Sequence, residues 1–562
     1  MPSVNPPTPA LVSERGAQRL PRWALMLLCA AYLIPGVFGR EPWKNADITA
    51  FGYMSSIADG RSSWMAPALA GQPGDGALLP YWIGALAIKA LPFLDESLAA
   101  RLPFALLLSA TLALIWYTTL HLARTEAAQP VAFAFGGEAQ PLEYARALAD
   151  GAVLAAIASL GLLQLGHETT PELVQLSGVA LLMWSLAVAA RRRRAAEIAA
   201  IGSLTVIAAS GAPAIALALG AGGFATCHWS AYPGSRRLRP WLVAGMVTSA
   251  VFAGVGHAWA WRVVPRLSAP WDLVRLAAWF LWPAWLLAAW TLWRWRRHMS
   301  YRHIAVPSVG LAVALAASLA MGGSDRALLL AVPSVAVLAA FALPTLERAA
   351  GAAMDWFSVS FFTLLAIAIW VFYAGVMTGM PAKAGERIER LLPGFDPHFS
   401  APLLAIALAG SLAWLALVRW RTARVQHAVW KSLVLPASGV ALSWLLLLTL
   451  GLPMIDYARS YRPWVYMVAA ELPHAPACVA AQLPRSALAA LENYSDWRID
   501  ARPDAASHSD CPYLLVAENR RWPIAPPAGW LLVAHLHRPS ERDDGTAVFR
   551  KPDAPLIPAQ NS

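Results

Sequence analysis

The chain has 562 residues, of which 58% are hydrophobic and 14% are charged, and its formal net charge is +11. A soluble globular protein carries about 25% charged residues, so the composition excludes that class. The positive charge does not indicate nucleic-acid binding, because the arginines lie in short segments between apolar runs, a pattern typical of membrane proteins. We therefore expect a polytopic membrane protein that binds membrane lipids and no nucleic acid.

The chain begins with a basic segment containing Arg15, Arg19 and Arg22, followed by the first apolar run, 24–40. No small-residue cleavage site precedes Arg40, so we interpret this run as an uncleaved anchor with a cytoplasmic N-terminus. The first outer loop, 41–100, comes next. Its apolar segment 78–94 is short and is interrupted by a lysine, so we expect it to lie on the outer membrane surface.

Membrane-length apolar runs recur along the rest of the first 454 residues. The motif Gly211-Ala212-Pro213 divides an overlong stretch, 195–227, into two. We predict spans at 24–40, 102–122, 147–165, 171–190, 195–210, 212–227, 241–261, 274–293, 304–322, 327–346, 356–378, 400–418 and 434–453. Thirteen spans place the main arginine clusters in the cytoplasm and the C-terminus outside. These clusters are Arg191–Arg194, Arg236/Arg237/Arg239, Arg294/Arg296/Arg297/Arg302 and Arg419/Arg421/Arg424.

The composition changes near residue 455, where the tail becomes rich in proline, arginine and aspartate. Two strand-like runs, 513–517 and 530–534, predict a small α/β domain over 455–562, which would be periplasmic. The tail contains two cysteines, Cys478 and Cys511, which in an oxidising compartment are natural disulfide partners. The alternative is a pair of buried free thiols.

The first outer loop carries an aspartate, Asp47, at the start of a short amphipathic segment that ends at Gly60. Its spacing is that of a helix-capping residue, which is the simple structural interpretation. Its position directly after a membrane span is that of a functional carboxylate, because charged groups near the membrane are costly to keep. The sequence leaves both interpretations open.

Two other segments on the outer side hold polar groups. His167, Glu168 and Glu172 lie in the turn Gly166–Glu172, which would be either a solvated turn or part of a sugar or phosphate site. Arg326 lies in the segment Ser324-Asp325-Arg326 between two later spans. This segment would be either part of the same site or a turn with a local ion pair. The chain has no phosphate-binding glycine-rich loop and no paired Cys or His motif for a metal; whether a divalent cation takes part is left open.

The first outer loop resembles that of a known family. Asp47, Trp64-Met-Ala-Pro67, the run 69–73 and Tyr81-Trp82 match its motifs, and Ala99-Ala-Arg101-Leu-Pro103 matches the start of its second span. The family is the GT-C membrane glycosyltransferases, specifically the lipid A 4-amino-4-deoxy-L-arabinose transferases and the related protein mannosyltransferases. The resemblance implies a GT-C fold with thirteen spans and a periplasmic C-terminal domain. It also implies inverting transfer of a sugar from a polyprenyl-phosphate donor.

The resemblance assigns the essential catalytic acid to Asp47 and substrate-binding positions to His167, Glu168 and Glu172. The chain departs from the family where Ile48 replaces a second acid. It also departs where Asp75-Gly76-Ala77 replaces a lysine motif, so that Asp75 joins the substrate-binding candidates. The missing positive charge would then come from another residue that faces the donor phosphate. The candidates are Lys44, Arg61, Arg326 and Arg266.

The sequence thus predicts an inner-membrane glycosyltransferase with a periplasmic active site. Its partners would be a polyprenyl-phosphate sugar donor and a lipid or other envelope acceptor. A lipid flippase or transporter is the main alternative, but it predicts acidic residues within the spans, which are nearly absent. A glycan polymerase and a catalytically altered member of the family are further alternatives. The sequence does not identify the sugar or the acceptor.

Overall fold

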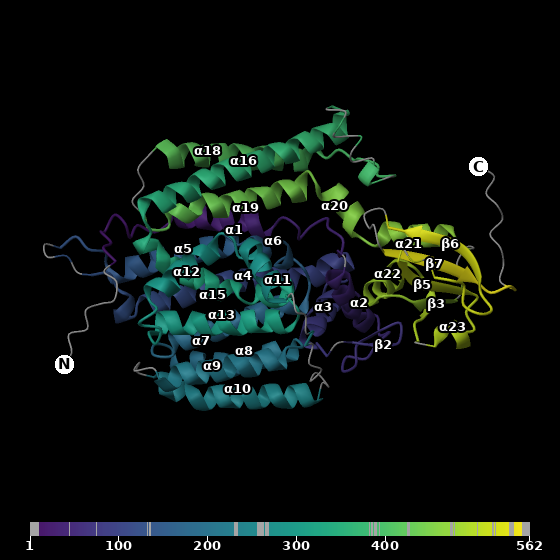
Figure 1. Cartoon of the computed structure of the whole chain (residues 1–562), viewed down its shortest axis with the longest axis horizontal. Coiled ribbons are helices and arrows are strands. Elements are labelled where there is room, and N and C mark those ends of the chain that lie inside the picture. Colours follow the sequence, from purple (N-terminus) through teal and green to yellow (C-terminus); the bar gives the residue numbers. More distant parts are fainter. Residues whose placement is uncertain are drawn as a thin grey trace.

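The structure is a computed structural model that describes most of the chain. The described residues are 10–43, 45–74, 76–131, 133, 136–229, 234–255, 263–264, 269–380, 383, 386, 390–392, 394–423, 428–472, 476, 478–502, 504–519, 522, 524–538 and 544–553. A large layered array of nearly parallel helices forms one end of the molecule, and a small sheet domain forms the other (Figure 1). The first outer loop and α20 lie between the two parts.

The helices of the array form along apolar runs, and glycine, proline or charged residues separate one run from the next. In chain order they are α1 (Arg22–Leu33), α4 (Glu96–Ala123), α5 (Pro141–Ala158), α6 (Leu160–Leu165), α7 (Pro171–Val188), α8 (Arg193–Ala209), α9 (Pro213–Trp229), α10 (Ser235–Val255), α11 (Ala269–Phe280), α12 (Ala284–Arg294), α13 (Arg302–Ala320), α14 (Asp325–Leu329), α15 (Val332–Ala342), α16 (Arg348–Thr378), α18 (Ala401–Ala423) and α19 (Lys431–Thr449).

Every predicted span range overlaps a helix or two consecutive helices of this array. Among the described residues, seven helices are long and apolar enough to cross a membrane: α4, α7, α10, α13, α16, α18 and α19. The bent pair formed by α11 and α12 makes an eighth candidate, with 109° between its two helices. The chain is therefore a multi-pass membrane protein. The break predicted at Gly211 is confirmed, because α8 ends at Ala209, Gly211 has a φ of +85° and α9 starts at Pro213.

The first outer loop folds into two helices and a hairpin. Helix α2 (Ala46–Ala58) carries Asp47, and α3 (Leu79–Ala90) covers most of the apolar segment expected at the membrane surface. The hairpin pairs β1 (Ala68–Leu69) with β2 (Gln72–Pro73). Helix α2 packs against α3 on one side and against the C-terminal domain on the other.

The C-terminal part starts with α20 (Leu452–Arg459) and α21 (Arg462–Ala470) and continues into the predicted α/β domain. Its five-stranded sheet has the order β4-β3-β5-β7-β6, with β3 parallel to β4 and β5 and with β7 antiparallel to β5 and β6. Both predicted strand runs form strands. The remaining elements are β3 (Cys478–Gln482), α22 (Arg485–Tyr494), β4 (Arg498–Asp500), α23 (Ala505–His508), β5 (Tyr513–Asn519), β6 (Leu531–His537) and β7 (Asp544–Arg550).

Candidate functional site

Asp47 lies in the first turn of α2 and is only 1% exposed. Its Oδ1 accepts hydrogen bonds from the backbone N–H and the hydroxyl of Thr169, at 2.7 and 2.8 Å. Its Oδ2 accepts from Nη2 of Arg40 at 3.0 Å and from the backbone N–H of Trp43 at 3.1 Å. The N-cap of α2 is Asn45, so the capping interpretation of Asp47 is wrong. Asp47 instead joins the first outer loop to the turn before α7.

Arg40 provides the counter-charge for Asp47 from the segment that follows α1. Its side chain is completely buried, and Nη2 also donates to the carbonyl oxygen of His167 at 2.9 Å. Burial acts to raise the pKa of Asp47, but the charges of Arg40 and Arg101 and the hydrogen bonds from Thr169 outweigh it and hold that pKa below its usual value. Asp47 is therefore ionised at neutral pH.

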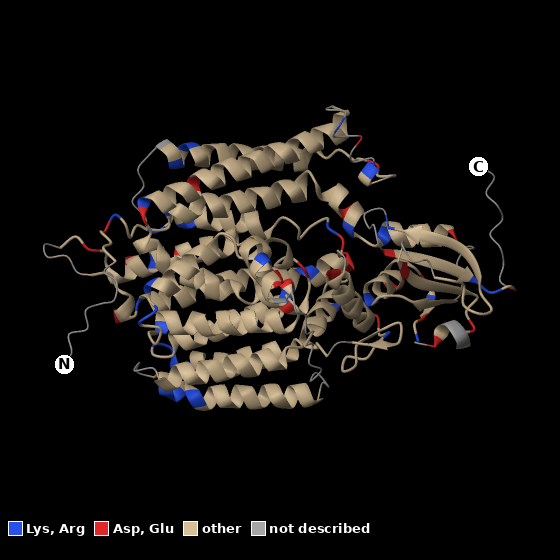
Figure 2. Cartoon of the chain, viewed as in Figure 1, with Lys and Arg blue, Asp and Glu red and all other residues tan. Residues whose placement is uncertain are grey.

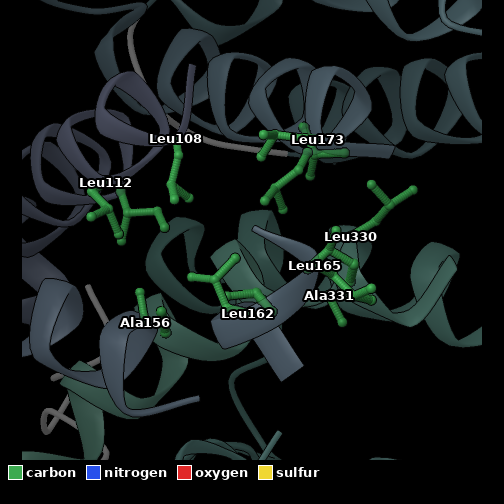
Figure 3. Close-up of a cluster of buried hydrophobic side chains, with 14 of the residues drawn as sticks. Leu108, Leu112, Ala156, Leu162, Leu165, Leu173, Leu330 and Ala331 are labelled. Atoms are coloured by element: carbon green, nitrogen blue, oxygen red, sulfur yellow. The ribbon is translucent and has the colours of Figure 1, made fainter. Parts of the chain in front are cut away.

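Residues 166–170 of the turn are buried, and Pro171 and Glu172 are half-buried, so the solvated-turn interpretation is wrong. Glu168 and Thr170 are 0% exposed. Apolar side chains from α6 and α7 on both sides of the turn, including Leu162, Leu165 and Leu173, lie in the hydrophobic core (Figure 3). Because this core fixes both ends of the turn, Thr169 can present its backbone N–H and its side-chain hydroxyl to Asp47 in a fixed position.

Glu168 and Glu172 form one charge cluster with Arg326 of α14. Arg326 Nη2 donates to Glu168 Oε2 at 2.7 Å, and its Nη1 lies 3.6 Å from Glu172 Oε2. Gln164 also donates to Glu168, at 2.9 Å. Burial raises the pKa of Glu168, and the charge of Arg326 opposes that rise. Although burial acts to lower the pKa of Arg326, the charges of Glu168 and Glu172 outweigh it and raise that pKa.

His167 takes no part in the charge cluster and contacts backbone carbonyls and aromatic rings. Its ring nitrogens are 2.7 and 2.9 Å from the carbonyl oxygens of Leu163 and Tyr32, and its ring contacts the rings of Tyr32 and Trp444. Burial lowers the pKa of His167 to about 4. The contacts with the two carbonyl oxygens act to raise that pKa, and burial outweighs them. The ring packs the end of α1 against the turn.

A cavity of about 580 Å³ opens beside the charge cluster. Residues of α9, of α13 and of the segment following α13 form its mostly apolar wall, which includes Ile215, Val313 and Met321. Glu172, Gln175, Ser324 and Arg326 provide polar groups in its lining. Small-molecule sites usually have volumes of about 300–1,000 Å³ and combine apolar walls with a few polar groups. The cavity therefore has the size and chemistry for part of an amphiphilic ligand.

The remaining site candidates from the sequence lie elsewhere or outside the described residues. Arg61 pairs with Asp59 at 2.8 Å and with Glu492 of the C-terminal domain at 3.4 Å. Asp59 is at the opposite end of α2 from Asp47, about 18 Å along the helix axis, so the structure does not bring Arg61 to Asp47. Lys44, Asp75 and Arg266 lie outside the described residues.

Sequence reasoning missed two residues that support Asp47. The sequence did mark Arg40 as unusual, because an arginine at the outer end of a predicted span departs from the positive-inside pattern. No sequence feature pointed to Asp456 of α20. It accepts Nε1–H of Trp43 at 2.6 Å and the backbone N–H of Glu41 at 3.3 Å, from residues more than 400 positions earlier. Burial raises the pKa of Asp456 to about 6 against these hydrogen bonds.

Within the described part of the chain, no group of three or more His, Cys, Asp or Glu side chains is arranged to hold a metal ion. The charged side chains of the cluster instead pair with one another. Sugar and phosphate groups are commonly recognised by carboxylate and guanidinium groups, so the cluster has suitable chemistry for either.

No protein-family model and no curated protein matches the sequence. Solved structures do match the fold. The crystal structure of ArnT from Cupriavidus metallidurans bound to undecaprenyl phosphate matches with a TM-score of 0.60 and 14% identity, over 94% of this chain and 97% of that chain. The same protein in the apo state gives a TM-score of 0.57 and 13% identity, with the same coverage of both chains. ArnT is a GT-C aminoarabinose transferase, so the resemblance seen in the sequence is confirmed for the fold.

Proposed function

We propose that this chain, which has the fold of ArnT, transfers a sugar from a polyprenyl-phosphate donor to an acceptor of the cell envelope. The observation that carries the proposal is the 580 Å³ cavity, which combines apolar walls from α9 and α13 with the polar Glu172 and Arg326. A lipid-linked sugar phosphate has the same division into an apolar chain and a polar head. The ArnT structure with undecaprenyl phosphate supports the choice of lipid.

The proposed topology has thirteen spans, with the N-terminus in the cytoplasm and the C-terminal domain in the periplasm. Lysine and arginine residues gather at the end of the helix array that is farther from the sheet domain (Figure 2). Basic residues favour the cytoplasmic side of membrane proteins. The charge cluster and the cavity would then lie toward the outer face of the inner membrane, where a periplasmic acceptor can reach them.

Asp47 is required for transfer in this proposal. Its four hydrogen bonds hold the first outer loop against the turn that carries Glu168 and leads into α7. An amide at this position can accept hydrogen bonds through only one of its two terminal atoms. Asp47→Asn would therefore release either the Thr169 side or the Arg40 side, and would also leave Arg40 without a compensating charge.

The experiment compares envelope glycolipids by mass spectrometry in cells that lack the protein and in cells complemented with wild type or with Asp47→Asn. We expect a sugar-bearing species that depends on the wild-type protein and is lost with Asp47→Asn. Immunoblotting of membranes checks that the variant accumulates. Identical glycolipid profiles with and without the wild-type protein would refute the proposed function.

A further inference from the structure

Among the described lining residues, Glu172 provides the one carboxylate of the cavity. Asp47 is 1% exposed and accepts four hydrogen bonds, and Glu168 is 0% exposed and accepts from Arg326 and Gln164. Glu172 differs from both. It lines the cavity, its side chain is 22% exposed, and its Oε2 has no hydrogen-bond partner among the described residues.

Arg326 has a similar unused group. Its Nη2 donates to Glu168, but its Nη1 has no hydrogen-bond partner within the described ranges and lies 3.6 Å from Glu172 Oε2. These two atoms face each other as an ion pair without a hydrogen bond, and both are buried within residues that line the cavity. That spacing is longer than a hydrogen bond, so a ligand can engage both groups without first breaking a bond between them.

The charges at the cavity disfavour a second anion. Arg326 is the only cation among the described lining residues, and Glu168 and Glu172 are both within 4 Å of it. A phosphodiester donor adds one negative charge, which Arg326 can stabilise through the free Nη1. A phosphate acceptor would add further negative charge next to Glu172, at a cost that rises as the site loses water. A hydroxyl adds no charge, but it must lose a proton when it attacks.

We infer that the acceptor is an uncharged hydroxyl group and that Glu172 removes its proton, an inference that rests on the proposed sugar transfer. The hydroxyl proton moves to the Glu172 carboxylate while the acceptor oxygen bonds to the anomeric carbon of the donor sugar. The bond between that carbon and the donor phosphate oxygen breaks, and its electron pair leaves with the polyprenyl phosphate. Arg326 Nη1 donates to the departing phosphate. Asp47 acts as a positioning residue through Thr169.

The first test is the linkage in the sugar-bearing product described above. We expect a glycosidic bond to a carbon-bound oxygen, which resists mild acid and gives no new phosphodiester signal in phosphorus NMR. A sugar attached through phosphate would overturn the hydroxyl inference and leave sugar transfer standing. Absence of any sugar-bearing product would overturn the proposed function itself, so the two failures are distinguishable.

The second test separates proton removal from binding. Glu172→Gln should lower product formation by about 100-fold or more without weakening the binding of undecaprenyl phosphate to the purified full-length protein in nanodiscs. Arg326→Gln should weaken that binding. Glu143→Gln is the matched control, because Glu143 pairs with Arg146 at the surface of α5, outside the cavity. Glu172→Gln with wild-type product formation would overturn the role of Glu172.

If Glu172→Gln neither forms product nor binds undecaprenyl phosphate, then Glu172→Asp is compared. The shorter carboxylate should restore binding and part of the product formation, because it keeps the proton-accepting group. Loss of binding in both variants would show that Glu172 supports the fold of the cavity, and the inference would be overturned. Asp47→Asn should weaken undecaprenyl phosphate binding together with turnover, whereas Glu172→Gln changes turnover alone.

Discussion

Trp43 links Asp47 of the first outer loop to Asp456 of α20. Its backbone N–H donates to Asp47 and its indole N–H donates to Asp456. The guanidinium carbons of Arg40 and Arg459 lie 4.5 and 5.5 Å from the centre of its ring. Cation–π contacts of this kind stabilise by about 0.5–2 kcal/mol each. A single residue therefore connects the carboxylate of the candidate site to the helix that leads into the C-terminal domain.

Asp456 makes this link sensitive to pH. Its pKa is about 6 in the folded protein, above the value of about 3.9 expected in an unfolded chain. Between these values the folded form holds a proton that the unfolded chain has released, so the Asp456 contribution to stability falls as the pH rises from about 4 to 6.

We therefore predict that Asp456→Asn flattens the pH dependence of thermal unfolding between about pH 4 and 6, by on the order of 2 kcal/mol across the window. Unfolding midpoints of the purified protein over this pH range provide the measurement. Asp396→Asn is the control, because Asp396 is exposed in the segment between α16 and α18. Parallel pH profiles for wild type and Asp456→Asn would contradict the prediction.

At the scale of elements, α7 carries Glu172 and is held by close contact with α8. A Cβ atom added at Gly178 of α7 would lie 2.6 Å from Cγ1 of Ile207 and 3.2 Å from the carbonyl oxygen of Ser203. Small residues at such crossings let membrane helices approach closely. Gly202 of α8 differs, because a Cβ added there would meet nothing within 4 Å.

Gly178→Ala should accordingly separate α7 from α8 and destabilise the protein by about 1–3 kcal/mol. Gly202→Ala should be neutral or stabilising by up to about 1 kcal/mol, since alanine favours a helix more than glycine does. Thermal unfolding of the two variants in the same detergent compares them directly. Equal midpoints for both would show that the close approach at Gly178 does not constrain the helix pair.

At the scale of the whole molecule, the first outer loop is held between the helix array and the C-terminal domain. Gly52 of α2 approaches Ala489 of α22 so closely that an added Cβ would lie 2.6 Å from the alanine Cβ. Glu492 accepts the backbone N–H of Ala70 at 2.9 Å, and Tyr461 donates to Asn45 at 3.1 Å. The C-terminal domain thus helps to fix the helix that carries Asp47.

The C-terminal domain has its own covalent constraint. A disulfide joins Cys478 at the start of β3 to Cys511 just before β5, with Cα atoms 5.0 Å apart and a sequence separation of 33. Cys29 and Cys227 are free cysteines. A bridge that closes a loop of this length stabilises by about 3–4 kcal/mol in the chain-entropy description.

We predict that the double variant Cys478→Ser/Cys511→Ser makes the C-terminal domain more sensitive to limited proteolysis, whereas Cys29→Ser does not. In wild-type protein denatured without reductant, a thiol reagent should label Cys29 and Cys227, and reduction should add the other two cysteines. Labelling of all four before reduction would rule out the bond.

The amino-acid sequence by itself determined the class of protein, the positions of the helices and the α/β character of the tail. These properties follow from local features: the length of apolar runs, the break at Gly211-Ala212-Pro213 and the short strand-like run 513–517. It also identified Asp47 and the turn Gly166–Glu172 as the polar segments to examine. Local pattern could not show that α11 and α12 meet at 109°, because that angle depends on packing.

Only the tertiary structure decided what each polar residue contacts. Arg40 pairs with Asp47, and Trp43 donates to Asp456. No periodic pattern in the sequence predicts either contact. The same holds for Arg326, which meets Glu168 across 158 residues of chain. Packing then distinguishes three polar residues of one turn. His167 is packed among aromatic rings, Glu168 is fully buried with a hydrogen bond to each carboxylate oxygen, and Glu172 lines the cavity. Hydrogen-bond saturation and burial are properties of the packed fold, so no pattern of residue types along the chain could have distinguished these three.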